Sequence, residues 1–153
     1  MSSDVRVQKV TAAVTFPLRQ RVLRPHETLE QLSLPGDDDP DAGHFAALDE
    51  DGVVIGTASV RREPPPWDEA DATAWRLRGM ATDDARRSEG VGTAVLGAVV
   101  EHVHAHGGGL LWCNARVPAK EFYERAGFTT RGDEWDDPVI GPHVRMLRST
   151  DGV

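Results

Sequence analysis

In the first part of the chain, hydrophobic and polar residues form short alternating runs. VRVQKV (residues 5–10) alternates apolar and polar positions, which predicts a strand. FPLRQRVLRP (residues 16–25) predicts a helix that ends at Pro25. HFAALDEDGVVIGTASV (residues 44–60) holds two apolar runs around Glu50-Asp51-Gly52, which predicts a hairpin.

Strands and helices alternate in the second half. TAWRLRGMAT (residues 73–82) predicts a strand, and apolar residues at helical spacing from Val91 predict a helix that ends at Gly107. The remaining predicted elements are a strand, a helix and two strands: GLLWCN (109–114), PAKEFYERA (118–126), FTTRGDEW (128–135) and HVRMLR (143–148). This order predicts an α/β fold with a mixed sheet flanked by helices. We expect residues 1–153 to form a single domain.

The net charge, the apolar runs and the single cysteine argue against several classes of function and location. The chain has 17 Lys and Arg against 25 Asp and Glu, a net charge of −8, which argues against binding to nucleic acid or anionic membranes. It has no apolar run of the roughly 18 residues that a membrane helix needs, and we expect a soluble protein that is not exported. Cys113 is the only cysteine, which excludes an internal disulfide and favours the reducing cytoplasm. Its apolar setting, LLWC, predicts a packed core thiol.

The segment RRSEGVGT (residues 86–93) stands at the predicted strand-to-helix junction. A helix N-terminus offers unpaired backbone N–H groups, and glycines let a phosphate approach them closely. Four arginines predict a basic patch around it: Arg76, Arg78, Arg86 and Arg87. A dinucleotide fingerprint would need glycine at Val95, and a P-loop would need Gly-Lys-Ser/Thr. Taken alone, the segment is a weak signal, and an ordinary turn with a solvent-facing arginine pair is the favoured interpretation.

Two sequence blocks taken together are more informative about function than the glycine loop alone. LRGMATDDARRSEGVG (residues 77–92), followed by NARVPAKEFYERAGF (residues 114–128), resembles the GNAT superfamily of N-acetyltransferases. The resemblance extends over roughly residues 44–148 and implies the acyl-CoA N-acyltransferase fold. In that fold a central twisted mixed sheet is flanked by helices, and its central strands, here those around Met80 and Trp112, splay apart to admit pantetheine.

The same resemblance implies a set of cofactor-binding residues. The backbone of Met80, Ala81 and Thr82 would hydrogen-bond the pantetheine arm and polarise the thioester carbonyl, as an oxyanion hole does. Backbone N–H groups of the loop would hold the pyrophosphate, and the residues concerned are Ser88, Glu89, Gly90, Val91, Gly92 and Thr93. Arg87, Gly90 and Gly92 fit the family's loop pattern, and Asn114 fits the later block. Acetyl-CoA is the implied cosubstrate, with no metal.

By the same resemblance, Tyr123 would protonate the departing thiolate. Its helical spacing with other apolar residues also suits a core aromatic. The base that deprotonates the amine is less well indicated, because many family members carry a glutamate on the strand before the loop and WRLRGM has none. His143 is the first candidate, with a structural histidine as the alternative. His44 and Glu134 are weaker candidates, and relay through water would also suffice.

The acceptor is not identified by these patterns, although a small-molecule amine is favoured. The acidic balance mildly favours a cationic molecule, and it counts against a toxin that acetylates charged tRNA. A noncatalytic acyl-CoA sensor or interaction module is the alternative function. His102, His104 and His106 resemble a metal cluster, but only two of them share a helix face, so favourable charge at a helix C-terminus is preferred. A homodimer is common in the family, but no motif here predicts one.

Overall fold

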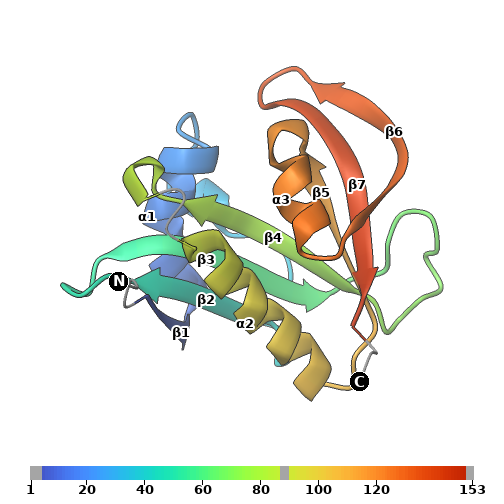
Figure 1. Ribbon diagram of the computed structural model, residues 1–153, viewed down its shortest axis with the longest axis horizontal. Helices are drawn as coiled ribbons and strands as arrows, with labels where there is room; N and C mark the ends of the chain where they lie inside the picture. The colour runs from blue at the N-terminus through green and yellow to red at the C-terminus, as the bar shows by residue number, and fades with distance from the viewer. Residues whose placement is uncertain (1–4, 87–89, 151–153) are drawn as a thin grey trace. The chain divides into compact units, whose positions relative to one another are not determined.

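The computed structural model describes residues 5–86 and 90–150. In this part of the chain, seven strands form one sheet in the order β1-β2-β3-β4-β5-β7-β6, with helices around it (Figure 1). The strands are β1 (Arg6–Val10), β2 (Gly43–Leu48), β3 (Val54–Arg62), β4 (Trp75–Thr82), β5 (Leu110–Arg116), β6 (Thr129–Asp137) and β7 (Gly141–Ser149). The helices are α1 (Ala12–Leu23), α2 (Val91–Ala105) and α3 (Lys120–Arg125), with 3₁₀ turns η1 (Glu30–Leu32), η2 (Asp84–Arg86) and η3 (Val117–Ala119). The predicted mixed sheet flanked by helices is confirmed.

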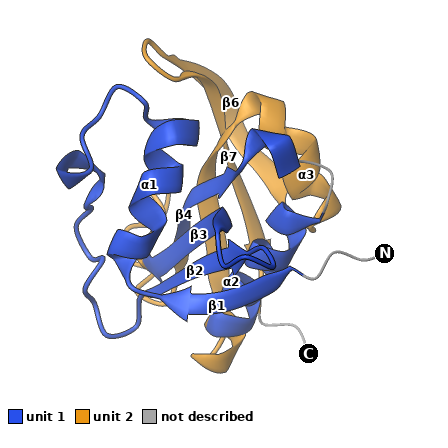
Figure 2. Cartoon of the chain, turned by 90° about the vertical axis from the view of Figure 1, so that its left-hand side faces the viewer, with its two compact units in different colours: residues 1–61, 77–102 blue, residues 62–76, 103–153 orange. Residues whose placement is uncertain are grey.

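The chain packs as two compact units (Figure 2). Unit 1 comprises residues 1–61 and 77–102, and unit 2 comprises residues 62–76 and 103–153. Strand β4 begins in unit 2 and continues into unit 1. That residues 1–153 act as one domain, and that the strands around Met80 and Trp112 splay apart, both stay predictions.

Unit 1 is built on the predicted hairpin. Strands β1, β2 and β3 pair in antiparallel fashion, with His44 opposite Ser59. Helices α1 and α2 lie on opposite faces of β2 and β3 in both views (Figures 1 and 2). Burial on both faces explains why successive residues of β2 are apolar and buried, such as Phe45, Ala46 and Ala47.

Helix α1 begins four residues earlier than the sequence pattern predicts, at Ala12, and ends at Leu23. Pro17 lies inside the helix. The helix turns Thr15, Leu18 and Arg19 toward the interior. The buried polar positions Thr15 and Arg19 obscure the apolar period, so the start could not be located from hydrophobicity alone.

Unit 2 contains an antiparallel sheet in which β7 lies between β5 and β6. Asn114 of β5 lies opposite Arg145 of β7, and Arg145 lies opposite Arg131 of β6. The beginning of β4 adds a parallel strand, in which Trp75 and Arg76 face Leu111 and Trp112. The last strand of the chain is therefore inserted between two earlier ones, an order that local patterns do not predict.

The glycine run after α2 yields a stability prediction. Gly109 has φ +129°, and a Cβ there would lie 2.6 Å from the carbonyl oxygen of Thr73. Gly107 has φ +105°, but a Cβ there would meet nothing within 4 Å. Gly109→Ala is therefore expected to lower the free energy of unfolding by about 2–5 kcal/mol, from backbone strain plus a steric clash. Gly107→Ala, the matched control, should cost about 1–3 kcal/mol from strain alone.

Urea unfolding of the two variants, followed by circular dichroism, measures both losses. Equal losses at the two positions would contradict the close approach of Thr73 to Gly109. A larger loss at Gly109 supports it.

Candidate active site

The end of β4 is shaped by a glycine in unit 1. Gly79 has φ +66°, a conformation that side chains rarely adopt, and its carbonyl accepts a hydrogen bond from the Thr57 hydroxyl at 2.9 Å. The three residues predicted to hold pantetheine follow directly. Ala81 is buried, and Met80 and Thr82 are half-buried. Gly79 thus gives β4 a local irregularity just before the predicted oxyanion hole, although the strand continues to Thr82.

A buried arginine packs beneath this irregularity. The guanidinium of Arg19 donates to the Leu32 carbonyl at 3.3 Å and to the Thr15 hydroxyl at 3.2 Å. Its Nε would lie 2.9 Å from a Cβ built on Gly79, so a larger residue there would collide with it. Burial lowers the pKa of Arg19, which the negative charge of Asp37 partly opposes. The sequence analysis did not predict a role for Arg19, because the neighbouring residues of α1 do not show that its side chain points inward.

Helix α2 begins at Val91, as predicted, directly after Gly90. Gly90 has φ +81°, and a Cβ on it would meet nothing within 4 Å. Val91 is buried, whereas Gly90 and Thr93 are exposed and Gly92 is half-buried. The Cγ1 of Val91 fills the space where Gly56 of β3 lacks a side chain, at 2.4 Å from a Cβ built there. This close packing holds the start of α2 against β3.

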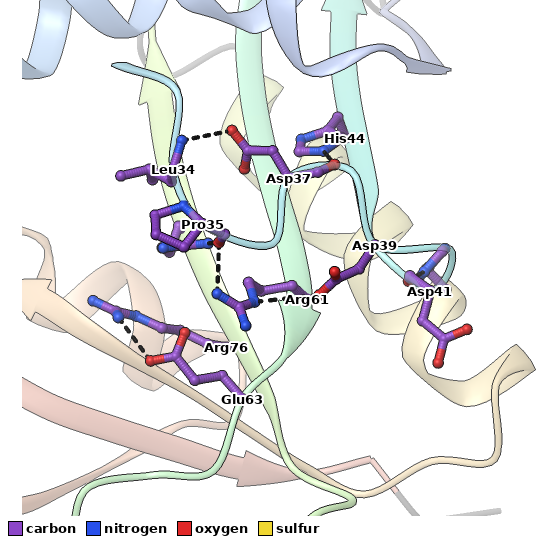
Figure 3. A network of polar contacts seen from close by, with 11 residues as sticks. Leu34, Pro35, Asp37, Asp39, Asp41, His44, Arg61, Glu63 and Arg76 are labelled. Atoms are coloured by element: carbon purple, nitrogen blue, oxygen red, sulfur yellow. Dashed lines mark hydrogen bonds and ion pairs between the residues drawn. The ribbon is translucent and has the colours of Figure 1, made fainter. Parts of the chain in front are cut away.

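Arg87, Ser88 and Glu89 lie outside the residues that the structure describes. Of the four arginines predicted to form a basic patch there, the three that the structure describes have partners elsewhere in the chain. Arg86 forms an ion pair with Asp49 at 3.6 Å, and Arg76 pairs with Glu63 at 3.0 Å (Figure 3). Arg78 donates to the Pro35 carbonyl at 3.0 Å. Their charge is therefore engaged within the protein rather than concentrated at the loop.

Tyr123 lies on α3 in unit 2, as the pattern predicted, and is 6% exposed. Its ring makes edge-to-face contacts with Phe122 and Phe128, at centroid distances of 5.2 and 5.3 Å. Burial raises the pKa of Tyr123 well above its usual value, with the neighbouring Cys113 thiol as a second cause. The phenol therefore carries its proton at neutral pH, as a proton donor must.

His143 lies on β7 and is 6% exposed. Its Nδ1 is 2.8 Å from the Gly141 carbonyl oxygen. Because a carbonyl can only accept, Nδ1–H donates this bond and, in the neutral ring, Nε2 keeps its lone pair. The ring stacks on Trp135 at a centroid distance of 5.6 Å. The contacts with Gly141 and Trp135 thus fix the tautomer and the ring position of His143, whose role as a base stays a prediction.

Tyr123 and His143 belong to opposite faces of the sheet in unit 2. Successive residues of a strand point to opposite faces, so Cys113 and Asn114 do not share one. Cys113 lies beside Tyr123, whereas Asn114 shares its face with Arg145 and, two residues along β7, with His143. The two candidate catalytic groups therefore approach β5 from different sides.

The weaker candidate bases have other surroundings. In His44, Nε2–H donates to the Asp37 carbonyl at 2.9 Å, and Nδ1 accepts from the Ser59 hydroxyl at 2.8 Å (Figure 3). With both ring nitrogens engaged, His44 is a structural histidine that anchors the loop before β2. Glu134 is exposed on β6. Both remain less suitable than His143.

The histidines of α2 separate into different environments. His102 donates to the Asp41 carbonyl at 2.7 Å, and His106 makes an edge contact with Trp75. Across residues 5–86 and 90–150, no group of three or more His, Cys, Asp or Glu side chains could hold a metal ion.

Strand β5 presents two informative side chains. The Cys113 thiol is buried, and burial raises its pKa to about 12, as expected for a core thiol. The Oδ1 of Asn114 is also buried, and it has no hydrogen-bond partner in the described part of the chain. A buried acceptor without a partner is uncommon and points to a ligand that donates a hydrogen bond.

Comparisons with known proteins agree with this architecture. The model of the Acetyltransferase (GNAT) family matches residues 12–128. YitI, described as an uncharacterized N-acetyltransferase of Bacillus subtilis (strain 168), is 31% identical over 145 residues, which cover 95% of this chain and 96% of YitI.

Solved structures show the same fold. A GCN5-related N-acetyltransferase from Kribbella flavida superposes with a TM-score of 0.73 at 20% identity, covering 95% of this chain and 97% of that one. An aminoglycoside 6′-N-acetyltransferase complexed with coenzyme A superposes with a TM-score of 0.74 at 14% identity, with the same coverage of both chains. The fold is that of the acyl-CoA N-acyltransferases. The chain belongs to the GNAT family, and it is an N-acetyltransferase.

Among the described residues, no helix is both long enough and apolar enough to cross a bilayer.

Proposed function

We propose that this enzyme transfers an acetyl group from acetyl-CoA to the amine of a small molecule, by direct attack within a ternary complex. The observation that carries the proposal is the start of α2, where Gly90, with open space around its Cα, directly precedes the first turn of the helix. We also propose that it acts in the cytoplasm, where its single cysteine would stay reduced.

The residues present suit acetyl-CoA. The N-terminus of α2 suits the pyrophosphate, because its first N–H groups lack intrahelical partners and Gly90 leaves the approach open. The buried, unpartnered Oδ1 of Asn114 suits an amide N–H, and pantetheine contains two amides. The backbone N–H groups of Met80 to Thr82 directly follow Gly79, whose positive φ departs from regular strand geometry within β4.

The chemistry assigns one proton transfer to each catalytic candidate. The amine nitrogen attacks the thioester carbonyl carbon, and the C–S bond of the resulting adduct breaks to give an amide and a thiolate. Nε2 of His143 accepts the proton that the nitrogen loses. The Tyr123 hydroxyl donates a proton to the thiolate, which leaves as CoA-SH.

The cofactor half of the proposal has a direct test in calorimetric titration with acetyl-CoA. Gly90→Asp should abolish saturable binding, because a carboxylate then occupies the phosphate approach. Asp tolerates a positive φ and is favourable at a helix N-terminus, so the helix should survive. Gly90→Asn, equal in size but neutral, should bind within about tenfold of the wild-type affinity, a loss of about 1.4 kcal/mol. Equal affinities of the two variants would refute the phosphate site.

A further inference from the structure

One face of the sheet in unit 2 carries a connected group of arginines and aromatic rings. We call it the arginine–tryptophan face, and its members are Trp67, Arg76, Trp112, Arg131, Trp135, His143 and Arg145. The Arg76 guanidinium lies over Trp112 at 5.0 Å, and Trp112 meets Trp67 edge to face. Arg131 lies over Trp67 at 4.8 Å, and Arg145 lies over Trp135 at 5.1 Å. Each arginine of this face therefore has its guanidinium carbon over a tryptophan ring.

Two of these arginines lie opposite each other, an arrangement that the repulsion of like charges disfavours. Arg131 of β6 and Arg145 of β7 are directly opposite in the sheet, and like charges at such positions are destabilising. Neither forms an ion pair with a carboxylate within the described residues. Arg76, on the same face, shows the contrast, because Glu63 neutralises it at 3.0 Å. The Arg131–Arg145 pair thus lacks the compensation that its neighbour has.

The tryptophan contacts of Arg131 and Arg145 do not consume their hydrogen-bond donors. The attraction of a guanidinium to a ring face is electrostatic, and its N–H groups can still donate to an anion. The Nε of Arg145 is buried and has no hydrogen-bond partner in the described chain. A planar carboxylate pairs with such N–H groups in the forked geometry that guanidinium favours. Arg131 and Arg145 are therefore organised to bind an anion.

This anion site adjoins the candidate base. His143 and Arg145 are two residues apart on β7 and share a face, which separates them by about 7 Å. Asn114, assigned above to pantetheine, begins the row that continues through Arg145 to Arg131. A compact molecule with an amine at one end and a carboxylate at the other could reach both His143 and the arginine pair.

We propose that the acceptor is an amino carboxylic acid whose carboxylate is bound by Arg131 and Arg145 while its amine faces His143. This inference rests on the proposed function and names its acceptor class. It differs from the cationic acceptor that the net charge of −8 favoured, because the Arg131–Arg145 pair is locally cationic although the whole chain is acidic. Local charge decides what a site binds, whereas net charge mainly governs solubility and long-range attraction.

The test compares the twenty free L-amino acids with their carboxamides. Saturable changes in tryptophan fluorescence report binding without turnover, since three of the four tryptophans belong to this face. We expect amino acids to bind and the matching carboxamides to bind at least about tenfold more weakly. Arg131→Gln with Arg145→Gln should weaken amino acid binding about 10-fold to 100-fold and leave carboxamide binding unchanged. Arg125→Gln, on the exposed end of α3, is the matched control and should change neither.

Several results would overturn the assignment. They are equal binding of carboxamides, unchanged affinity in the double variant, stronger binding of spermidine or O-phosphoethanolamine, and no saturable signal with any amino acid. Titration with acetyl-CoA distinguishes this failure from failure of the proposed function. If acetyl-CoA binds and some other amine is acetylated, only the acceptor class is wrong.

Discussion

Tyr123→Phe is expected to lower kcat by about 10²–10⁴-fold, the usual contribution of a general acid. The variant removes only the hydroxyl that would protonate the thiolate. Phenylalanine keeps the edge-to-face contacts with Phe122 and Phe128, so the fold should be retained. Affinity for acetyl-CoA should change little, because the loss falls on the transition state.

The pH dependence of the wild-type enzyme sharpens this prediction. Because burial raises the pKa of Tyr123 well above its usual value, the phenol should stay protonated at neutral and mildly alkaline pH. Deprotonation of Tyr123 should therefore not limit the rate below about pH 10, the ordinary tyrosine pKa. Its contribution to stability is fully present below that pH and is lost as pH rises toward the folded-state value. Full kcat in Tyr123→Phe would remove the acid assignment and leave a core aromatic.

His143→Gln is expected to reduce kcat by about 10²–10⁴-fold, since the amine would lose its proton acceptor. The Nδ1–H bond to the Gly141 carbonyl holds Nε2 as the acceptor, and glutamine offers no basic nitrogen in its place. Steady-state kinetics at saturating acetyl-CoA measure the effect. The KM for acetyl-CoA should stay within about twofold of wild type, because the pyrophosphate would bind elsewhere.

His26→Gln provides the matched control, because the His26 side chain is 45% exposed and belongs to neither candidate catalytic group. Its kcat should equal that of wild type. If His143→Gln also keeps its kcat, a structural histidine is the correct interpretation and the base must be sought elsewhere. Circular dichroism of both variants excludes unfolding as the cause of a loss.

Local patterns predicted most elements of the fold. The turn Glu50-Asp51-Gly52 and its flanking apolar runs are sufficient to define a hairpin, and the period from Val91 is sufficient to define α2. The position of β7 between β5 and β6 was not predictable in this way, because it depends on pairing between distant residues. The early start of α1 was missed because Thr15 and Arg19 are polar and yet buried.

The residues of the candidate site likewise fall into those that the local sequence predicted and those that it did not. Gly90, Asn114, Tyr123 and His143 were found from the motif and its resemblance, and their roles stay predictions. The arginine pair was not found, because Arg131 and Arg145 become neighbours only through the β6–β7 register. The partners Asp49 and Glu63, which engage Arg86 and Arg76, are likewise far from them in sequence. The spacing of residues along one segment can predict the chemistry of that segment. Which charged side chains are neutralised or brought together depends on contacts between distant segments, and these arise only in the fold.

The most direct measurement is turnover of acetyl-CoA with a set of amines: amino acids, polyamines, aminoglycosides and a peptide N-terminus. Released CoA thiol and acetylated product are quantified together, and the buried Cys113 should add no thiol background. We expect the enzyme to release one CoA for each amine that it acetylates, and none when no amine is present. Saturable binding of acetyl-CoA with no transfer to any amine would contradict it and indicate an acyl-CoA sensor. Release of CoA without an amine would also contradict it, because water would then be the acceptor.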